Sequence, residues 1–318
     1  MTNIAGNEVM EYRTLGRTGL KVSLLGFGAS PLGDVFRKTD PAESQRAVHL
    51  AIDHGINYFD TSPYYGRTLS EQRLGQALAG KRHQIILATK CGRIDADVFD
   101  FSPKAITASV DESLRRLQTD YVDLLQAHDV EFGGVQQIID ETIPAMRRLQ
   151  QQGKARFIGI TGYPLKTLLR IAEKVPVDTI LSYCHYNPMI TDMDDVLTPF
   201  ARREKIGLIN ASPLHMGLLS ERAAPDWHPA PPELRAAAKN AVEICRRGVD
   251  IASVALRFCL DHDYVSTTLV GMSRLKDVEA NVAVVRARSD PALIQEIRAA
   301  IGPAFNCVWP SGRIENQN

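Results

Sequence analysis

The stretch IILATKCGRIDADVFDFSPKAITASVDESLRRLQTDYVDLLQAH, residues 85–128, decides the fold. It holds a short apolar run at 85–90, a longer segment from Pro103 with apolar residues at helical spacing, and a second apolar run at 121–128. Proline is favoured in the first turn of a helix, because the N–H that it lacks needs no partner there. The stretch therefore predicts a strand, a crossover helix and a second strand parallel to the first.

The same alternation continues on both sides of this unit. Pro41, Pro164 and Pro232 stand near the starts of three further helical segments. Eight strands are predicted, at residues 24–28, 56–60, 85–90, 121–128, 155–160, 179–183, 206–211 and 265–270. Eight such units close naturally into a barrel. The prediction is an α/β fold, one (β/α)₈ TIM barrel forming a single domain over residues 1–318, and an open doubly wound sheet is the alternative.

Three segments fall outside the eight units. The run YRTLGRTGLKVSLLG at 12–26 places a Gly-containing turn between two alternating runs, which predicts a β-hairpin that caps the N-terminal mouth of the barrel. The connection at 212–232 is long, and loops of this length on the C-terminal face are usually functional. Residues 305–318 are expected to fold partly over the mouth before fraying, so the ordered core should span about residues 11–305.

The composition excludes several classes of partner. Lys plus Arg and Asp plus Glu both total 37 in the 318 residues, so no net field favours nucleic acid or an anionic membrane. The apolar runs are too short to cross a bilayer, and the N-terminus lacks the pattern of a secretory signal. Five cysteines without a CxxC pair indicate reduced packing residues. We expect a cytoplasmic protein with a small-molecule ligand, either a monomer or a small homo-oligomer.

Three ionisable residues end predicted strands. Asp60 ends the second strand, Lys90 the third and His128 the fourth. Each has an ordinary explanation taken alone: a turn-forming aspartate, a solvated lysine or a hydrogen-bonded core histidine. In barrel enzymes, however, the catalytic groups come from the C-terminal ends of several strands, which all open on one face. Together the three residues predict an active site.

These residues and their surroundings resemble the aldo-keto reductase superfamily from Tyr12 to Val285. The resemblance rests on LGRTGLKVSLLGFG, INYFDTSPYYG, SEQRLGQAL, ILATK, YVDLLQAH, GKARFIGITGY and ASPLHMGLLS. It implies a nicotinamide-dependent oxidoreductase whose catalytic tetrad is Asp60, Tyr65, Lys90 and His128. Hydride transfer needs a matching proton transfer, which Tyr65 would perform with Lys90 lowering its pKa. Asp60 would hold Lys90, His128 would orient the substrate oxygen, and Tyr64 would form a wall.

The resemblance also places the cofactor over the barrel mouth. Gly28 belongs to a lone GxG, which by itself is weak evidence for dinucleotide binding. The chain departs from many relatives at Thr161-Gly162, at Ala211 and at Tyr183, where an aromatic side chain could replace a lost stacking partner. The predicted cofactor contacts are Gly28, Asp60, Thr161, Gly162, Tyr183, Ser212, Leu214, Gly271, Met272, Ser273, Asp277 and Asn281.

The choice between NAD and NADP rests on Asp277. The segment VGMSRLKDVEAN at 270–281 follows the eighth strand and opens a helix, the usual phosphate-binding position in barrels. A carboxylate at Asp277 would repel a 2′-phosphate but could accept a hydrogen bond from a ribose hydroxyl. We therefore expect NAD, while Arg274 or Lys276 leaves NADP possible.

The blocks LSYCHYNP, ASPLHMGLLS and PDWHPAPPELRAA resemble the branch of the superfamily that oxidises aldoses such as L-galactose, L-fucose or D-arabinose to lactones. The predicted substrate contacts are Tyr64, His128, His185, Asn187, His215, Trp227 and His228. Each of the loop residues could instead pack locally, and the spacing of the histidines predicts no zinc site. A pyridoxal dehydrogenase, a general aldehyde or alcohol oxidoreductase and a non-catalytic nicotinamide-binding subunit are the alternatives.

Overall fold

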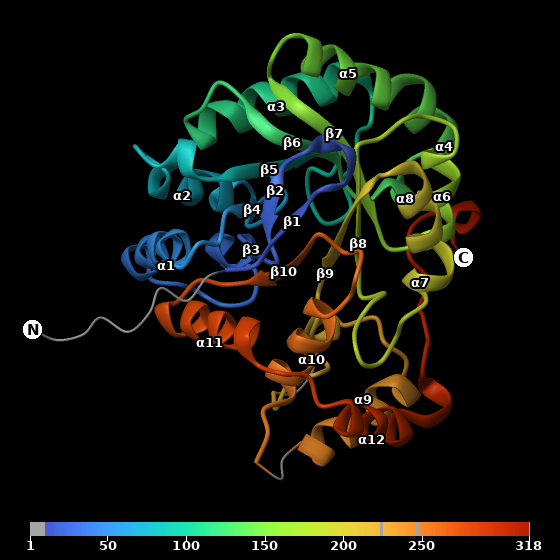
Figure 1. Ribbon diagram of the computed structural model, residues 1–318. Helices are drawn as coiled ribbons and strands as arrows, with labels where there is room; N and C mark the ends of the chain where they lie inside the picture. The colour runs from blue at the N-terminus through green and yellow to red at the C-terminus, as the bar shows by residue number, and fades with distance from the viewer. Residues whose placement is uncertain (1–9, 223–224, 246–247, 318) are drawn as a thin grey trace, which may run out of the picture.

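The computed structural model describes residues 10–222, 225–245 and 248–317. At its centre, eight parallel strands form a closed barrel in the order β10-β3-β4-β5-β6-β7-β8-β9 (Figure 1). The strands are β3 (Leu25–Gly28), β4 (Tyr58–Asp60), β5 (Ile86–Cys91), β6 (Val122–Ala127), β7 (Ala155–Gly162), β8 (Thr179–Tyr183), β9 (Gly207–Ala211) and β10 (Thr267–Gly271). The barrel prediction is confirmed, and pairing of β10 with β3 excludes the open sheet.

Helices surround the barrel. They are α1 (Pro41–Asp53), α2 (Leu69–Ala77), α3 (Pro103–Leu117), α4 (Val135–Gln137), α5 (Ile143–Gln151), α6 (Leu165–Ala172), α7 (Met193–Val196), α8 (Thr198–Glu204), α9 (Pro232–Cys245), α10 (Ile251–Leu260), α11 (Leu275–Arg286) and α12 (Pro291–Ile301). Local sequence fixes several of their starts. Asp40 accepts a hydrogen bond from the Ala42 amide (2.9 Å) ahead of α1, and Ser102 accepts one from the Ala105 amide (3.3 Å) ahead of α3.

The strands are buried on both faces, as expected for a parallel sheet covered by helices. All six residues of β6 are buried, for example. One apolar cluster fills the barrel interior, and its members include Leu15, Val22, Tyr58, Ala88, Leu124, Leu181, Ile209 and Leu269. A larger cluster lies between the sheet and the helices. The alternating short apolar runs of the sequence are therefore explained by burial on both sides.

The predicted hairpin is present and closes the end of the barrel opposite the strand C-termini. Strands β1 (Tyr12–Thr14) and β2 (Lys21–Ser23) pair antiparallel. Between them, Leu15 is fully buried and belongs to the barrel-interior cluster. The Arg17 amide donates to the Lys205 carbonyl (2.6 Å), just before β9 begins. The hairpin is thus part of the barrel core at its N-terminal end.

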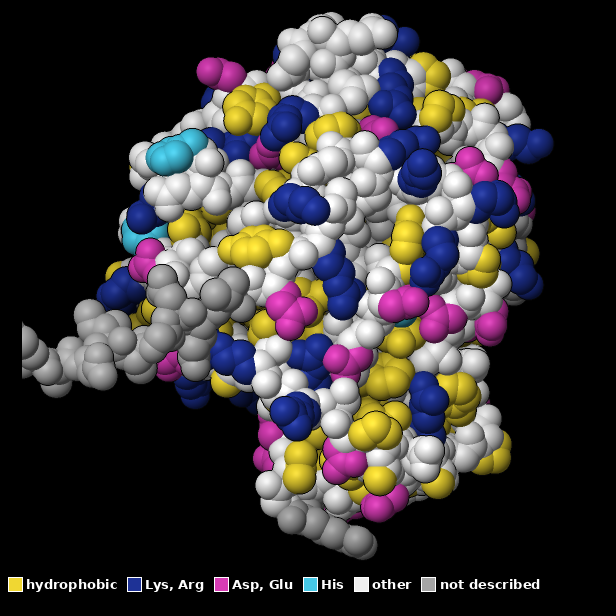
Figure 2. All heavy atoms as spheres, in the orientation of Figure 1, with side chains coloured by type: hydrophobic (Ala, Val, Ile, Leu, Met, Phe, Trp, Pro, Cys, Tyr) yellow, Lys and Arg dark blue, Asp and Glu magenta, His cyan; other side chains and the backbone are white. Residues whose placement is uncertain are grey.

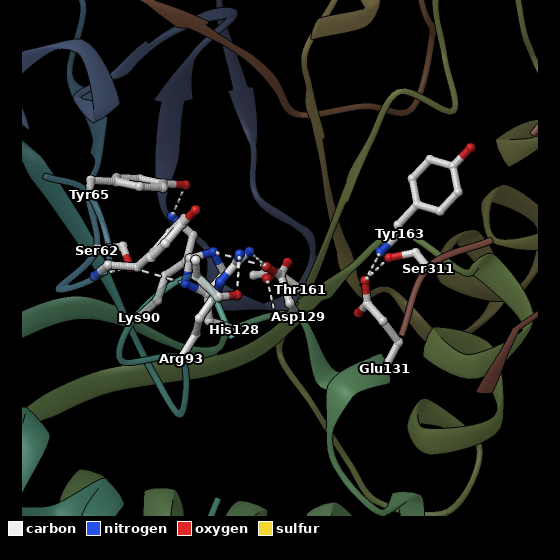
Figure 3. Close-up of polar contacts among 12 residues, drawn as sticks. Ser62, Tyr65, Lys90, Arg93, His128, Asp129, Glu131, Thr161, Tyr163 and Ser311 are labelled. Atoms are coloured by element: carbon white, nitrogen blue, oxygen red, sulfur yellow. Dashed lines mark hydrogen bonds and ion pairs between the residues drawn. The ribbon is translucent and has the colours of Figure 1, made fainter. Parts of the chain in front are cut away.

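The ordered part of the chain extends past residue 305, where the sequence predicted fraying to begin. Trp309 is buried and stacks on Tyr163, with ring centroids 4.6 Å apart. Asn316 is also buried, and its amide donates to the Glu131 and Gly133 carbonyls (both 2.8 Å). These long-range contacts hold residues 306–317, here called the tail, against the loops that follow β6 and β7. Figure 3 includes one of them, between Ser311 and Glu131.

The surface and the cysteines agree with the composition. Figure 2 shows Lys and Arg interspersed with Asp and Glu over one face of the molecule, without a large area of one sign. Within the described part of the chain, every helix is too short or too polar to cross a membrane. Cys91, Cys184, Cys245 and Cys259 are buried free thiols, and Cys307 is partly exposed.

Candidate active site

The predicted tetrad comes together at the C-terminal ends of neighbouring strands. Asp60 ends β4, Tyr65 lies in the loop that follows it, Lys90 is in β5 and His128 directly follows β6. Figure 3 shows the Tyr65 hydroxyl turned toward the Lys90 ammonium and the His128 ring beside both. The Lys90 Nζ donates to the Tyr65 hydroxyl at 3.2 Å. The geometric requirement of the prediction, a phenol next to the ammonium of the third barrel strand, is met.

Lys90 is held by several partners although it is buried. Its Nζ forms an ion pair with Asp60 Oδ1 and donates to the Thr61 carbonyl (2.9 Å). The other Asp60 oxygen, Oδ2, accepts from Gln126 Nε2 at 2.8 Å. A buried ammonium without such partners would be strongly disfavoured. Gln126, which lies in β6 and was not predicted as a site residue, therefore fixes Asp60 and through it Lys90.

Two glycines position the loop that carries Tyr65. Gly66 has φ +62°, and a Cβ at Gly66 would overlap the carbonyl of Gly33. A Cβ at Gly33 would come within 2.6 Å of the Tyr65 carbonyl oxygen. Only glycine permits this close backbone approach, and at Gly66 it also permits the left-handed conformation. The glycine after the tyrosine thus packs the Tyr65 loop against the loop that follows β3.

Burial and charge act in opposite directions on the site's pKa values. Burial disfavours charge on Lys90, but Asp60 and Tyr65 outweigh it and raise the pKa of Lys90 to about 12. Burial raises the pKa of Tyr65 above its ordinary value, and the Lys90 charge lowers it only in part. Lys90 lowers the pKa of Tyr65, as predicted. The net pKa is nevertheless raised, because the effect of burial is larger. Near neutrality Lys90 is charged and Tyr65 carries its proton.

His128 is neutral and its tautomer follows from its neighbours. Burial, followed by the charges of Lys90 and Arg93, lowers the pKa of His128 well below its ordinary value. Its Nδ1 lies 3.0 Å from Ser62 Oγ, and that oxygen accepts from the Tyr64 amide (3.2 Å). Among the described residues, Nδ1 is the one acceptor in reach of the Ser62 hydroxyl proton. We therefore assign Ser62 as the donor to Nδ1, which places the imidazole proton on Nε2.

A second charged pair, which the sequence analysis missed, lies beside His128. Asp129 Oδ2 is 3.7 Å from His128 Nε2, and Arg93 Nη1 donates to the same oxygen at 2.5 Å. The Arg93 guanidinium lies over the Tyr64 ring, 3.8 Å from its centroid, so Tyr64 forms a wall of this site. Arg93 follows β5 and Asp129 follows β6. The rule that found Lys90 and His128, inspection of strand ends, would have found this pair as well.

The predicted cofactor residues lie on or after the strands across the mouth. Thr161 and Gly162 are in β7 and buried, and Thr161 Oγ1 accepts from the Asp129 amide (3.1 Å). Tyr183 ends β8, half-buried, with its ring centroid 5.5 Å from that of Tyr163. Gly28 ends β3, where a Cβ would lie 3.0 Å from the Val270 carbonyl oxygen. Ser212 and Leu214 follow β9 and are partly exposed. Gly271 ends β10, and the next two residues, Met272 and Ser273, are buried. Asn281 lies in α11.

Asp277 lies in the first turn of α11, and its carboxylate is paired with two arginines. Its carboxylate accepts from the Arg274 amide (3.1 Å) and from the Arg274 guanidinium, with Nη2 to Oδ1 at 2.5 Å. Arg37 Nη2 lies 3.5 Å from its Oδ2. Arg274, foremost by its hydrogen bond, more than offsets the effect of burial and lowers the pKa of Asp277. Asp277 therefore stays charged and engages the arginines that could otherwise bind a phosphate.

The predicted sugar contacts after β8 and β9 are mostly buried and hydrogen-bonded to neighbouring residues. His185 Nδ1 lies 2.8 Å from Asp192 Oδ1, and Asn187 Nδ2 donates to His215 Nδ1 (3.0 Å). His228 Nε2 donates to the His215 carbonyl at 3.0 Å. All four predicted side chains are at most 3% exposed. His215 and His228 lie in the loop between β9 and α9, and Asn187 joins this loop to the one after β8, so contact with a sugar stays a prediction.

Trp227 differs from its neighbours in the same loop. It is 58% exposed, while the adjacent His228 is 3% exposed and packs near Trp309. Burial lowers the pKa of His215, the centre of this network, to about 3, so it is neutral. The sequence could not separate these roles, because the partners that bury the histidines come from the tail and from the loop after β8.

Comparison with known proteins agrees with this geometry. The model of the aldo/keto reductase family matches residues 24–301, and the chain belongs to this family of nicotinamide-dependent oxidoreductases. L-galactose dehydrogenase of Arabidopsis thaliana is 49% identical, covering 96% of this chain and 99% of that protein. D-arabinose 1-dehydrogenase of Saccharomyces cerevisiae is 32% identical over 92% and 94% of the two chains. An aldo-keto reductase from Bacillus halodurans, solved in its holo form, superposes with a TM-score of 0.79 at 31% identity, covering 98% of this chain and 100% of that one.

The residues at the mouth fit a bound dinucleotide. The Ser273 hydroxyl is buried without a hydrogen-bond partner among the described residues, and it stands at the start of α11, where phosphate groups bind in barrels. Gly28 and Gly271 keep the adjoining strand ends free of side chains. Tyr183 and Thr161 stand at the opposite side of the mouth, near His128 and Asp129. A nicotinamide dinucleotide laid across these strand ends would bring its ring to the tetrad.

Proposed function

We propose that this enzyme oxidises an aldose of the L-galactose, L-fucose or D-arabinose type at the anomeric carbon and forms the lactone. The proposal is supported by the Tyr65–Lys90 contact in the barrel mouth and by relatives named for such reactions, above all the L-galactose dehydrogenase. A nicotinamide dinucleotide, when bound, supplies the acceptor for the hydride that leaves the anomeric carbon, and its oxidised ring carries a positive charge.

The chain's own residues handle the proton. Tyr65, once deprotonated, takes the proton of the anomeric hydroxyl, and the Lys90 ammonium stabilises the phenolate at 3.2 Å. His128, with its proton on Nε2, donates a hydrogen bond to the same sugar oxygen and orients it toward Tyr65. Asp60 keeps Lys90 in place through their ion pair. Ser62 keeps His128 in the tautomer that this step needs.

We further infer a preference for NAD over NADP. Asp277 is charged and binds Arg274 and Arg37, so a 2′-phosphate would have to compete with a carboxylate for these guanidinium groups. The adenosine ribose of NAD has hydroxyl groups and no 2′-phosphate, so it does not compete for the arginines. One of its hydroxyl groups can donate a hydrogen bond to the Asp277 carboxylate. This inference applies to the adenosine half of the cofactor and does not depend on the sugar.

The experiment is a panel of L-galactose, L-fucose, D-arabinose and pyridoxal, each with NAD and with NADP. The readout is the absorbance of the reduced nicotinamide, and the lactone is identified in the product mixture. We expect turnover of at least one aldose, faster with NAD. Turnover of pyridoxal alone would replace the aldose proposal with the pyridoxal alternative. A higher kcat/KM with NADP would contradict the inference drawn from Asp277 and leave the aldose proposal standing.

A further inference from the structure

The carboxylate of Asp129 lies beside His128 in the candidate active site, with Oδ2 3.7 Å from His128 Nε2. Asp129 directly follows His128, is 3% exposed and has φ +52°, a conformation uncommon outside glycine. Its amide is fixed by Thr161 Oγ1 at 3.1 Å. Figure 3 shows its side chain between His128 and Thr161, within the same group of residues as Lys90. The backbone thus aims a charged group into the catalytic site.

Arg93 holds this carboxylate from one side only. Its Nη1 donates to Asp129 Oδ2 (2.5 Å), its Nη2 to the Ala96 carbonyl (3.1 Å), and its plane covers the Tyr64 ring. Among the described residues, the basic side-chain nitrogens within 4 Å of the carboxylate belong to Arg93 and His128, and both lie near Oδ2, so Oδ1 has no basic partner. A carboxylate oxygen in this position can accept a hydrogen bond from a ligand.

A gain in stability does not by itself explain why the buried Arg93–Asp129 ion pair is present. Removing two charges from water costs free energy that their attraction often fails to recover. Burial in fact raises the pKa of Asp129, in opposition to the Arg93 charge. The position of the pair beside His128 and Thr161 therefore calls for a role other than stability.

The distances indicate which substrate group this is. His128 Nε2, which would hold the reacting oxygen, is 3.7 Å from Asp129 Oδ2. In a sugar, the distance between the oxygen on the reacting carbon and the oxygen on the next carbon is similar to the length of a hydrogen bond. On the basis of the proposed aldose oxidation, we propose that Asp129, positioned by Arg93, accepts a hydrogen bond from the C2 hydroxyl and makes the enzyme select sugars that carry it.

The test compares L-galactose with 2-deoxy-L-galactose in the wild type and in Asp129→Asn, Arg93→Lys and Glu112→Gln. Asparagine keeps the size of the side chain and removes its charge. Lysine at position 93 keeps the charge but not the planar group that covers Tyr64. Glu112 forms an exposed pair with Arg115 and serves as the control. We measure kcat and KM separately for each sugar, and the affinity for NAD by titration.

We expect the wild type to prefer L-galactose about 10- to 100-fold in kcat/KM, the usual worth of one hydrogen bond to a charged group. Asp129→Asn should remove most of this preference through KM, because its loss of kcat/KM should be much larger on L-galactose than on the deoxy sugar, and its NAD affinity should be nearly unchanged. Arg93→Lys should act in the same direction, and Glu112→Gln should match the wild type.

Three results would overturn the inference. An equal loss on both sugars in Asp129→Asn would mean that Asp129 acts on Tyr65 and Lys90 or on folding, not on the C2 hydroxyl. An unchanged preference would mean that no hydrogen bond is made there, while the aldose proposal survives. A wild type that oxidises neither sugar, nor any aldose of the panel, would overturn the proposed function and this inference together.

Discussion

In the proposed mechanism, proton transfer depends on Tyr65. Replacing it with phenylalanine removes the hydroxyl that contacts Lys90 and keeps the ring that packs edge-on against His128. We expect Tyr65→Phe to lower kcat by several orders of magnitude, because the lost group acts only in the transition state. NAD affinity, measured by titration, should stay nearly unchanged. Tyr64→Phe is the matched control and should retain most of the activity, and the opposite ranking of the two variants would refute the assignment.

The raised pKa of Tyr65 predicts how the reaction depends on pH. Aldose oxidation needs the phenolate, and burial keeps the folded-state pKa above the ordinary value near 10 despite Lys90. The rate of oxidation should therefore rise continuously from about pH 7 to pH 10, while the reverse reduction, which needs the phenol, should not. Lys90→Met removes the charge that favours the phenolate and should shift the profile to higher pH. A plateau of kcat below pH 8 would contradict this prediction, provided that chemistry limits turnover.

Single residues also set the limit of prediction from sequence. Asp60, Lys90 and His128 could be predicted because each lies at or next to the C-terminal end of a strand, and strand order alone brings them to one face. The burial of His185 and His215 could not be predicted, because it depends on how the loop after β8 folds around His185 and on the distant Trp309, which packs against His215. The pKa of Tyr65 was predicted from its charged neighbour alone, because the sequence does not show how deeply the phenol is buried.

Among the elements, the strands could be predicted best and the tail least. Parallel strands covered on both faces appear in the sequence as short continuous apolar runs, and all eight were located. The tail has no periodicity, and its order comes from contacts more than a hundred residues away, such as Trp309 with Tyr163 and Asn316 with Glu131. Its attachment at Glu131 explains why a polar terminal segment is ordered.

Glu131 makes the loop that holds the tail sensitive to pH. Burial, with a smaller effect from the Asp129 charge, raises the pKa of Glu131 to about 8. Between about pH 4.5 and pH 8 the folded protein keeps this proton while the unfolded chain loses it, so Glu131 makes stability fall as pH rises through this window. We expect Glu131→Gln, which has no proton to lose, to gain a few kcal/mol relative to the wild type between about pH 5 and pH 9.

The measurement is urea unfolding of the wild type, Glu131→Gln and Glu112→Gln at about pH 5, 7 and 9. Ser311 Oγ and the Tyr163 amide both donate to Glu131 Oε1, and a glutamine can preserve these bonds through its own carbonyl oxygen. The exposed Glu112 should give a difference from the wild type that does not change over this range. The same flat difference for Glu131→Gln would show that the carboxyl group is ionised in the folded protein.

The barrel as a whole has two different ends, one that carries the proposed catalytic residues and one that the hairpin closes. The tetrad and the Asp129–Arg93 pair lie at the strand C-termini, and the hairpin closes the other end with Leu15. Active sites of barrels of this kind lie at the C-terminal face, so changes at the opposite face should affect stability alone. Leu15 is the sharpest place to test this separation, because it is fully buried and the hairpin contributes no residue to the site.

We expect Leu15→Ala to lower the free energy of unfolding by about 2–5 kcal/mol, because it removes buried methyl groups and leaves a cavity in the barrel interior. A Cβ at Gly207 would lie 2.7 Å from Leu15, so the surrounding chain is packed closely around this side chain. Val98→Ala, at a site 51% exposed, is the control and should change stability by less than about 0.5 kcal/mol. Under conditions where both variants are folded, kcat and KM should equal those of the wild type. A large change in kcat for Leu15→Ala would mean that the hairpin end is coupled to the tetrad through the barrel interior.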